Sequence, residues 1–325
     1  MKSNFWQKIS AKGGPAVGGN EPILALAPMA GISDSAFRQL CKTFGADVTY
    51  TEMISADAIA YNSKKTLEML KFDKSEKPIV AQLFGKRPEM FIKAVKMIEK
   101  AGFDGIDINF GCPARKVVAH GGGVTLMKDL EKCRELIATT IENTKLPVSV
   151  KIRAGIEKVT ALDFLKAIKD LPIAAIMVHG RTFKDSFSGP IDFEMIRQVK
   201  QNFSGIVIGN GGINTPEEAK QMLDKTGVDG LGLARGLYGR PWLFQEIKDY
   251  LRNGKYHKIG TEDIKKIALQ HAKIAYKSKG SHGIIEMRKH LCWYVRGFDG
   301  ANELRKKLVT VETIREIKDI LKHKT

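Results

Sequence analysis

Short apolar runs rich in β-branched residues alternate with amphipathic helical patterns along the first 240 residues of the chain. From these runs we predict eight strands, over 22–28, 48–53, 78–84, 105–110, 147–153, 174–180, 205–212 and 230–236. The segments between them, such as 88–102 and 215–227, repeat their apolar residues at helical spacing. Eight β–α units of this size predict an α/β fold, the (β/α)8 TIM barrel. A doubly wound open sheet is the alternative, but it usually carries a glycine fingerprint that residues 24–34 do not supply.

The pattern changes from about Leu251, where the strand runs disappear. Three basic amphipathic helices are predicted there, over 263–278, 284–295 and 311–324. We therefore expect three parts: a flexible, glycine-containing lead-in over 1–20, a barrel over 21–250 and a smaller all-α helical domain over 251–325.

The composition is typical of a soluble globular protein, with 43% apolar residues and no apolar stretch long enough to cross a bilayer. The first 22 residues lack the features of a secretory signal. The four cysteines, Cys41, Cys112, Cys133 and Cys292, form no C-x-x-C pair, so neither a disulfide framework nor a zinc site has support. We expect a cytoplasmic protein with no metal and no membrane partner.

The net charge of +17 is unevenly distributed. Residues 252–325 contain 18 Lys and Arg against 8 Asp and Glu, which is more than half of the excess in under a quarter of the chain. Such a segment attracts polyanions, of which nucleic acid is the commonest large one in a cytoplasm. A well-solvated helical surface is the other interpretation.

Polar residues follow almost every predicted strand, where a TIM barrel carries its active site. They are Glu52, Gln82, Asn109 with Cys112, Lys151 with Arg153, His179 with Arg181, Asn210, and Arg235, and Met29 follows the first strand. Any one of them could be an ordinary structural group. Residues from eight strand ends meeting at one mouth, almost all of them polar, indicate an active site instead.

Glycine-rich turns follow the last two strands, at 209–213 and 234–240. Barrels frequently bind a phosphate at this place, because bare backbone N–H groups can approach an anion closely. We predict a phosphate site made by Asn210, Gly211, Gly212, Arg235 and Gly236, with plain tight turns as the alternative.

A cofactor with a phosphate tail would extend from these turns to the centre of the mouth. Lys151 lies within an apolar strand and needs a negative partner, such as a flavin that becomes anionic on reduction. Gln82 suits the donor and acceptor edge of such a ring, and the backbone at Met29 could cover its other side.

Cys112 lies in the segment DINFGCPARK, directly after a predicted strand and before a proline. Cys41 and Cys133 fall on helical patterns and are expected to be small buried hydrophobes. Cys112 instead leads into a glycine-rich loop, HGGG at 120–123, that we expect to move, and its thiol could give a proton to a substrate carbon. A nucleophile for acyl transfer is the other role, for which His179 could be the base.

Together these residues resemble the tRNA-dihydrouridine synthases, in particular the bacterial B-type subgroup. The resemblance covers nearly the whole chain and is carried by LAPMAGISDSAFR (26–38), QLFG (82–85), DINFGCPARKV (107–117), VKIRAG (150–155), VHGRT (178–182), GNGGI (209–213), ARGLYGRPWLF (234–244) and MRKHLCWYV (287–295). The chain departs from the family pattern at HGGGVTLM (120–127) and at Gly212, which stands where an acid is usual.

The resemblance implies an FMN enzyme that uses NADPH to reduce the C5=C6 bond of particular uridines in tRNA. Cys112 would protonate C5 after hydride from the flavin reaches C6. Gln82, Lys151 and His179 would contact the flavin ring system, and Asn109 and Arg153 would face the uracil. The remaining cofactor-binding positions would be Pro28, Met29, Ala30, Asn210, Gly211, Gly212, Ala234, Arg235 and Gly236. The basic helical domain would bind tRNA, chiefly through shape and phosphate contacts.

Two other functions remain open at this stage. A flavin barrel acting on a free pyrimidine, as in the dihydroorotate dehydrogenases, would share the phosphate site but has no reason to carry a basic helical tail. A non-catalytic RNA-binding barrel would have no reason to keep Cys112 and Lys151. We expect the protein to be a monomer.

Overall fold

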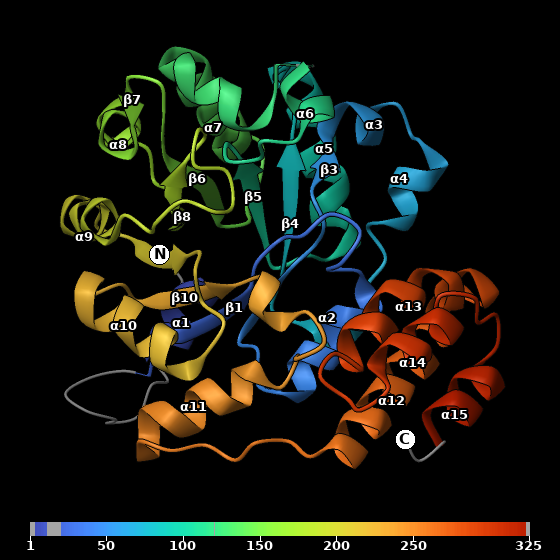
Figure 1. Cartoon of the computed structure of the whole chain (residues 1–325). Helices are drawn as coiled ribbons and strands as arrows, with labels where there is room; N and C mark the ends of the chain where they lie inside the picture. The colour runs from blue at the N-terminus through green and yellow to red at the C-terminus, as the bar shows by residue number, and fades with distance from the viewer. Residues whose placement is uncertain (1–3, 12–20, 120, 323–325) are drawn as a thin grey trace.

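Eight parallel strands close into a barrel in the computed structural model, which describes residues 4–11, 21–119 and 121–322 (Figure 1). The strands are β1 (Ile23–Leu26), β2 (Val48–Tyr50), β4 (Ile79–Phe84), β5 (Gly105–Asn109), β6 (Val148–Ile156), β8 (Ala175–Thr182), β9 (Ile206–Asn210) and β10 (Gly230–Leu233). Each pairs in parallel with the next, and β10 pairs with β1 to complete the circle. The predicted TIM barrel and all eight of its strands are confirmed.

Helices surround the barrel. They are α2 (Ser35–Thr43), α3 (Ala56–Ala60), α4 (Lys64–Glu68), α5 (Pro88–Ala101), α6 (Arg115–Ala119), α7 (Leu130–Glu142), α8 (Ala161–Ile168), α9 (Phe193–Asn202), α10 (Pro216–Thr226) and α11 (Leu243–Asn253). Local sequence explains their limits: α10 begins with a capping box between Thr215 and Glu218 and ends at Gly227, which has a φ of 66°. Two short strands, β3 (Ile54–Ser55) and β7 (Val159–Thr160), are additions that the sequence pattern does not predict.

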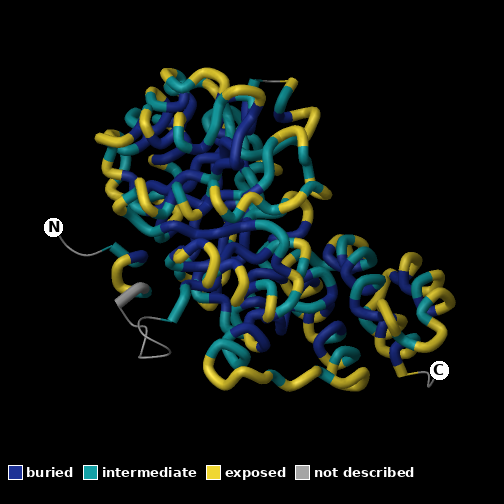
Figure 2. The backbone as a smooth tube through the Cα atoms, turned by 60° about the vertical axis from the view of Figure 1, so that its left-hand side comes forward, coloured by how far each residue is buried: buried dark blue, intermediate teal, exposed yellow. Residues whose placement is uncertain are grey.

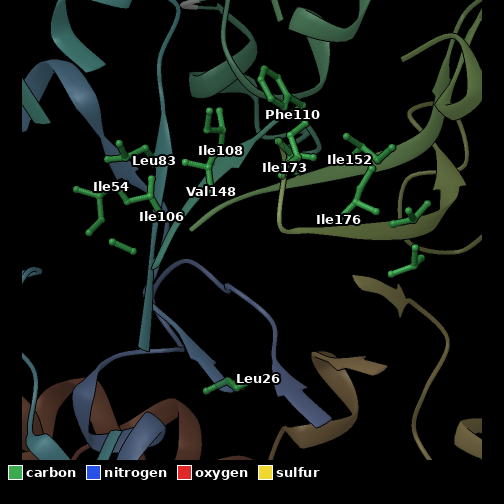
Figure 3. Packing of buried hydrophobic residues seen from close by; sticks show 14 of the residues in the cluster. Leu26, Ile54, Leu83, Ile106, Ile108, Phe110, Val148, Ile152, Ile173 and Ile176 are labelled. Carbon is green, nitrogen blue, oxygen red and sulfur yellow. The ribbon is translucent and has the colours of Figure 1, made fainter. Parts of the chain in front are cut away.

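Alternate residues of the strands pack on opposite sides of the barrel wall. Ile106, Ile108 and Val148 belong to the large outer core between strands and helices (Figure 3). Val48, Tyr50, Val80, Met177 and Ile208 form a separate cluster with Trp6. Cys41 and Cys133 are fully buried in the outer core, as predicted.

The segment predicted to be a flexible lead-in contains a packed helix, which corrects the prediction for that part. Helix α1 (Phe5–Ala11) places Trp6, only 1% exposed, in the inner cluster with its ring 6.4 Å from that of Tyr50. Local sequence does not reveal this burial, because the partners of Trp6 lie on distant strands. Residues 1–3 and 12–20 of the predicted lead-in lie outside the described residues.

Four helices, α12 (Thr261–Lys279), α13 (Ser281–Tyr294), α14 (Ala301–Leu308) and α15 (Ile314–Lys322), form the helical tail. Three of them match the predicted helices, and α14 is additional. The tail's core includes Ala36 and Leu40 of α2 and Trp242, so the tail packs directly on the barrel (Figures 1 and 2). None of the helices in the described ranges is long and apolar enough to cross a membrane.

Candidate active site

A cavity of about 860 Å³ opens at the carboxyl ends of the strands. The predicted catalytic, cofactor-binding and substrate-binding residues line it: Pro28, Met29, Ala30, Gln82, Asn109, Cys112, Lys151, Arg153, His179, Asn210, Gly211, Gly212, Ala234, Arg235 and Gly236. Glu52, also expected at the mouth, is not part of this lining, and its carboxylate accepts the backbone N–H of Gly31. The barrel therefore brings together positions that are separated by more than 200 residues in sequence. Their individual roles stay predictions.

The floor of the cavity is a chain of hydrogen-bonded side chains from β4 and β5. Nε2 of Gln82 donates to Oδ2 of Asp107 at 2.7 Å, and Nδ2 of Asn109 donates to Oε1 of Gln82 at 2.8 Å. Oδ1 of Asn109 accepts the backbone N–H groups of Gly111 and Cys112, at 3.0 and 2.9 Å. Asn109 thus connects the buried strands to the Cys112 turn.

Cys112 is held by a loop that packs back against it. Its carbonyl accepts the N–H of Val124 at 3.1 Å, and a Cβ on Gly123 would lie 2.6 Å from the same oxygen. Gly123 also has a φ of 61°, so a larger residue would open this contact. The loop was predicted to move, but Gly122 and Gly123 are buried; His120 lies outside the described residues. Burial raises the pKa of the Cys112 thiol, which keeps it protonated at neutral pH.

Lys151 lies on β6, and its side chain lines the cavity. Its Nζ donates to Oδ1 of Asn210 at 2.8 Å, and Nδ2 of Asn210 donates to the carbonyl of Gly232 at 2.7 Å. No described carboxylate lies within ion-pair distance of this ammonium group. Burial, assisted by the nearby charge of Arg153, lowers the pKa of Lys151 to about 7. The site thus has a cation ready for an anionic ligand.

His179 and Arg181 on β8 each carry a buried nitrogen, Nδ1 and Nη1, with no hydrogen-bond partner among the described residues. Buried polar atoms are normally paired, so both nitrogens indicate a ligand in the cavity. Burial, with the charges of Lys151 and Arg153, lowers the pKa of His179 to about 2. The imidazole of His179 is therefore uncharged at neutral pH.

The glycine turns form the other wall. Gly211 and Gly212 have φ values of 105° and 71°, and a Cβ on Gly236 would lie 2.3 Å from the carbonyl of Ile213. A Cβ on Gly212 would also meet Ile191 at 2.8 Å, which explains why no side chain stands there. Among the described residues, none accepts a hydrogen bond from the backbone N–H of Gly211, Gly212, Arg235 or Gly236. These free donors suit a phosphate.

Arg153, predicted to face the uracil, clamps two loops. Its guanidinium donates to the carbonyls of Gly111 at 2.8 Å, Thr182 at 3.0 Å and Ser186 at 2.9 Å. The side chain is 2% exposed, so its main contacts are with backbone, while a substrate contact stays a prediction.

Sequence reasoning missed an aromatic side chain on the same loop. Phe187, which is 48% exposed, lies within 5.4 Å of Arg153 and 5.0 Å of Arg235 as measured from guanidinium carbon to ring centre. Phe183 and Tyr238 also line the cavity. The loop after β8 has no regular pattern, and only its aromatic residues beside Lys and Asp could have signalled it.

The donor set of the cavity fits a flavin cofactor that carries a phosphate. It has free N–H groups and an arginine for a phosphate, a carboxamide for the ring edge, and an unpaired ammonium group for negative charge. Its volume is in the range of small-molecule sites. No group of three or more His, Cys, Asp or Glu side chains in the described part of the chain could hold a metal ion.

Fold and site together define a TIM-barrel enzyme with a cavity at the carboxyl ends of its strands and a cysteine at its mouth. The chain belongs to the dihydrouridine synthase (Dus) family, whose profile matches residues 25–325. This confirms the resemblance seen in the motifs.

Named relatives agree with this assignment. The chain is 36% identical to tRNA-dihydrouridine synthase B of Pseudomonas aeruginosa, over 87% of this chain and 86% of that protein. It is also 36% identical to tRNA-dihydrouridine synthase B of Shewanella oneidensis, over 84% and 86%. Among solved structures, the histamine dehydrogenase of Rhizobium sp. 4-9 has a TM-score of 0.55 at 15% identity, covering 79% of this chain and 49% of that one. That likeness shows the barrel fold alone.

Proposed function

We propose that this chain is a cytoplasmic tRNA-dihydrouridine synthase that binds FMN, takes electrons from NADPH and reduces the C5=C6 bond of particular uridines in tRNA. The family assignment and the names of its relatives support the reaction. One observation carries the site assignment: a protonated thiol, Cys112, shares a cavity with an ammonium group, Lys151, that lacks a carboxylate partner among the described residues.

FMN, when bound, supplies hydride to C6 of the uracil and is reduced again by NADPH. Cys112 delivers the proton to C5 from its Sγ. A raised pKa suits this role, because the thiol still holds its proton at neutral pH. The positive charges of Arg153 and Lys151 stabilise the thiolate that remains. Asn109, which fixes the backbone of Cys112, and Arg153 hold the uracil against the thiol.

The cofactor would be bound along the length of the cavity. The free N–H groups of Gly211, Gly212 and Gly236, with Arg235 and Asn210, would hold the phosphate. Gln82, Lys151 and His179 would contact the ring system, while Pro28, Met29, Ala30 and Ala234 would cover it from the first and last strands. His179 offers a neutral ring to this ligand.

The tRNA would lie across the mouth and the helical tail. Helix α13 borders the mouth at two points: a Cβ on Gly31 would lie 3.7 Å from Nζ of Lys289, and the rings of Trp293 and Tyr238 stack with centres 4.1 Å apart. Cations of the tail can therefore meet the phosphates that flank a uridine in the cavity. That uridine must be turned out of its stack to enter.

The first experiment is a visible absorption spectrum of the purified protein. We expect a flavin spectrum that NADPH bleaches without oxygen and that transcript tRNA restores. Flavin that free uracil or orotate reoxidises, and tRNA does not, would favour the free-pyrimidine enzyme. Absence of flavin after FMN is added would contradict the assignment of the cavity.

Replacing Cys112 by Ala isolates the proton donor. Cys112→Ala should bind FMN and tRNA as the parent does and lose about 100-fold or more in tRNA-dependent reoxidation, since general acid catalysis contributes roughly 10²–10⁴-fold. Cys292→Ala, which changes a half-buried cysteine of α13, is the matched control and should keep full turnover. Full activity in Cys112→Ala would make this cysteine a packing residue.

A further inference from the structure

A buried carboxylate, Asp107 of β5, lies beneath the cavity floor and has no role in the proposed function. It is 0% exposed, so it touches no ligand. Its Oδ1 accepts from Oγ of Ser149 at 2.7 Å, and its Oδ2 accepts from Nε2 of Gln82 at 2.7 Å. An apolar residue would avoid the desolvation of a charge at this place, so the acid needs an explanation.

The hydrogen bonds that begin at Asp107 run in one direction to Cys112. Gln82 donates to the acid and accepts from Asn109, and Asn109 accepts in turn from two backbone N–H groups. An ionised carboxylate can only accept, and a backbone N–H can only donate. With an acceptor at one end and donors at the other, both carboxamides between them have a single satisfactory orientation.

Reversing either carboxamide would create a conflict. A flipped Gln82 would place Oε1 against the carboxylate of Asp107, acceptor against acceptor, and a flipped Asn109 would place its NH2 against two N–H groups. Asp107 acts as a pure acceptor only in its charged form. Burial raises the pKa of Asp107 to about 6, against the hydrogen bonds of Ser149 and Gln82 and the charge of Lys151, so the acid is ionised above neutral pH.

We propose that Asp107 is a positioning residue, which fixes the carboxamides of Gln82 and Asn109 so that each presents a set pattern of donors and acceptors to the flavin and the uracil. The inference rests on the proposed function, because the ligand that reads this pattern is the one proposed there. Gln82 keeps one N–H and one lone pair for a ligand, and Asn109 keeps one N–H; both side chains line the cavity.

Asp107→Asn tests the proposal with almost no change in shape. An Asn side chain can accept from only one of its two partners and must turn an NH2 toward the other. Only one of its two orientations presents an acceptor to Gln82, so Gln82 is held less strictly than by a carboxylate. A misplacement of about 1 Å can lower a rate about 100-fold, so we expect tRNA-dependent reoxidation to fall roughly 10- to 100-fold. FMN should remain bound with a displaced absorption maximum and a changed midpoint potential.

Asp104→Asn is the matched control, because it removes a carboxylate just before the same strand. Asp104 pairs with Lys77 away from the cavity lining, and its loss should leave turnover and the flavin spectrum unchanged. The wild type is measured first: if it shows no flavin or no reoxidation by tRNA, the proposed function fails. If the wild type works and Asp107→Asn equals it in rate, spectrum and potential, only the positioning role is overturned.

A double variant separates positioning from stability. If Asp107 acts through Gln82, adding Asp107→Asn to Gln82→Ala should cause no further loss of rate. Losses that multiply would show that Asp107 acts independently and would overturn the proposal. The rates of the single and double variants are compared at equal folded fraction, which is taken from the melting curve of each variant.

Ser149→Ala gives a second test that keeps the carboxylate and its bond to Gln82. Turnover at pH 8 should stay within about threefold of the wild type, while loss of the Ser149 bond raises the pKa of Asp107 and moves the acid limb of kcat to higher pH. Lys151 and Tyr50 are the other titratable groups near Asp107. Neither produces an acid limb, since Lys151 loses charge as pH rises and burial raises the pKa of Tyr50 well above its usual range. An acid limb that does not move would contradict the proposal, even where Asp107→Asn fails to fold.

Discussion

The pKa of Lys151 predicts how cofactor binding depends on pH. In the free protein burial lowers this pKa to about 7, so the ammonium group is half deprotonated near pH 7 and largely deprotonated above pH 8. A bound flavin phosphate or an anionic ring favours the charged form and raises the pKa again. Binding therefore takes up a proton above pH 7, and affinity falls as pH rises.

The magnitude follows from the fraction of free protein that is protonated. With a pKa of about 7, the dissociation constant for FMN is about 4-fold above its low-pH limit at pH 7.5 and about 30-fold above it at pH 8.5. The expected rise between these pH values is about eightfold, or about 1.2 kcal/mol, provided the bound state keeps the charge. The phosphate of FMN has its second pKa near 6, so it does not titrate in this window.

Quenching of FMN fluorescence by the apoprotein measures this dependence, in wild type and in Lys151→Met. The variant should bind FMN more weakly at pH 7.5 and show no slope up to pH 8.5, because it has no proton to lose. His179 stays neutral in this window, and a raised pKa keeps Cys112 protonated through most of it, so neither should mimic the slope. A flat wild-type curve, or the same slope in Lys151→Met, would refute the assignment of Lys151 to the anionic ligand.

Two further predictions concern the parts outside the mouth. Trp6→Ala should lower the free energy of unfolding by about 3–5 kcal/mol, since it empties a fully buried aromatic site. Gln7→Ala, at the exposed neighbouring position, should change the melting temperature little, and equal melting temperatures of the two variants would contradict the packing of α1. Lys289→Glu should weaken tRNA binding roughly tenfold at low salt and less at high salt. Lys318→Glu, on the distant helix α15, is the control, and equal losses of affinity in both variants would place the tRNA elsewhere.

The sequence predicts the barrel well because its determinants are local. Each strand is a short run of β-branched residues, and chain direction alone places Gln82, Cys112 and Lys151 at the same end of a parallel barrel. Burial of Trp6 is different, since it depends on the ring of Tyr50 in another part of the chain. The loop clamp made by Arg153 likewise depends on carbonyl groups, which carry no sequence signal.

The contacts of α13 decide how the role of the tail should be tested. Deleting residues 252–325 would bare Leu40 of α2 and Trp242, both of which are buried in the tail's core. It would also strip Trp293 from Tyr238, a residue of the cavity wall, and remove the close contact between Trp293 and Gly239, where a Cβ would lie 2.4 Å from a backbone oxygen. Loss of activity on tRNA after such a deletion could therefore result from a disrupted cavity wall as readily as from a missing tRNA contact. Reversing a single surface charge leaves these packed surfaces in place, because a surface substitution usually changes stability by less than about 0.5 kcal/mol. Such variants therefore separate RNA binding from the shape of the site.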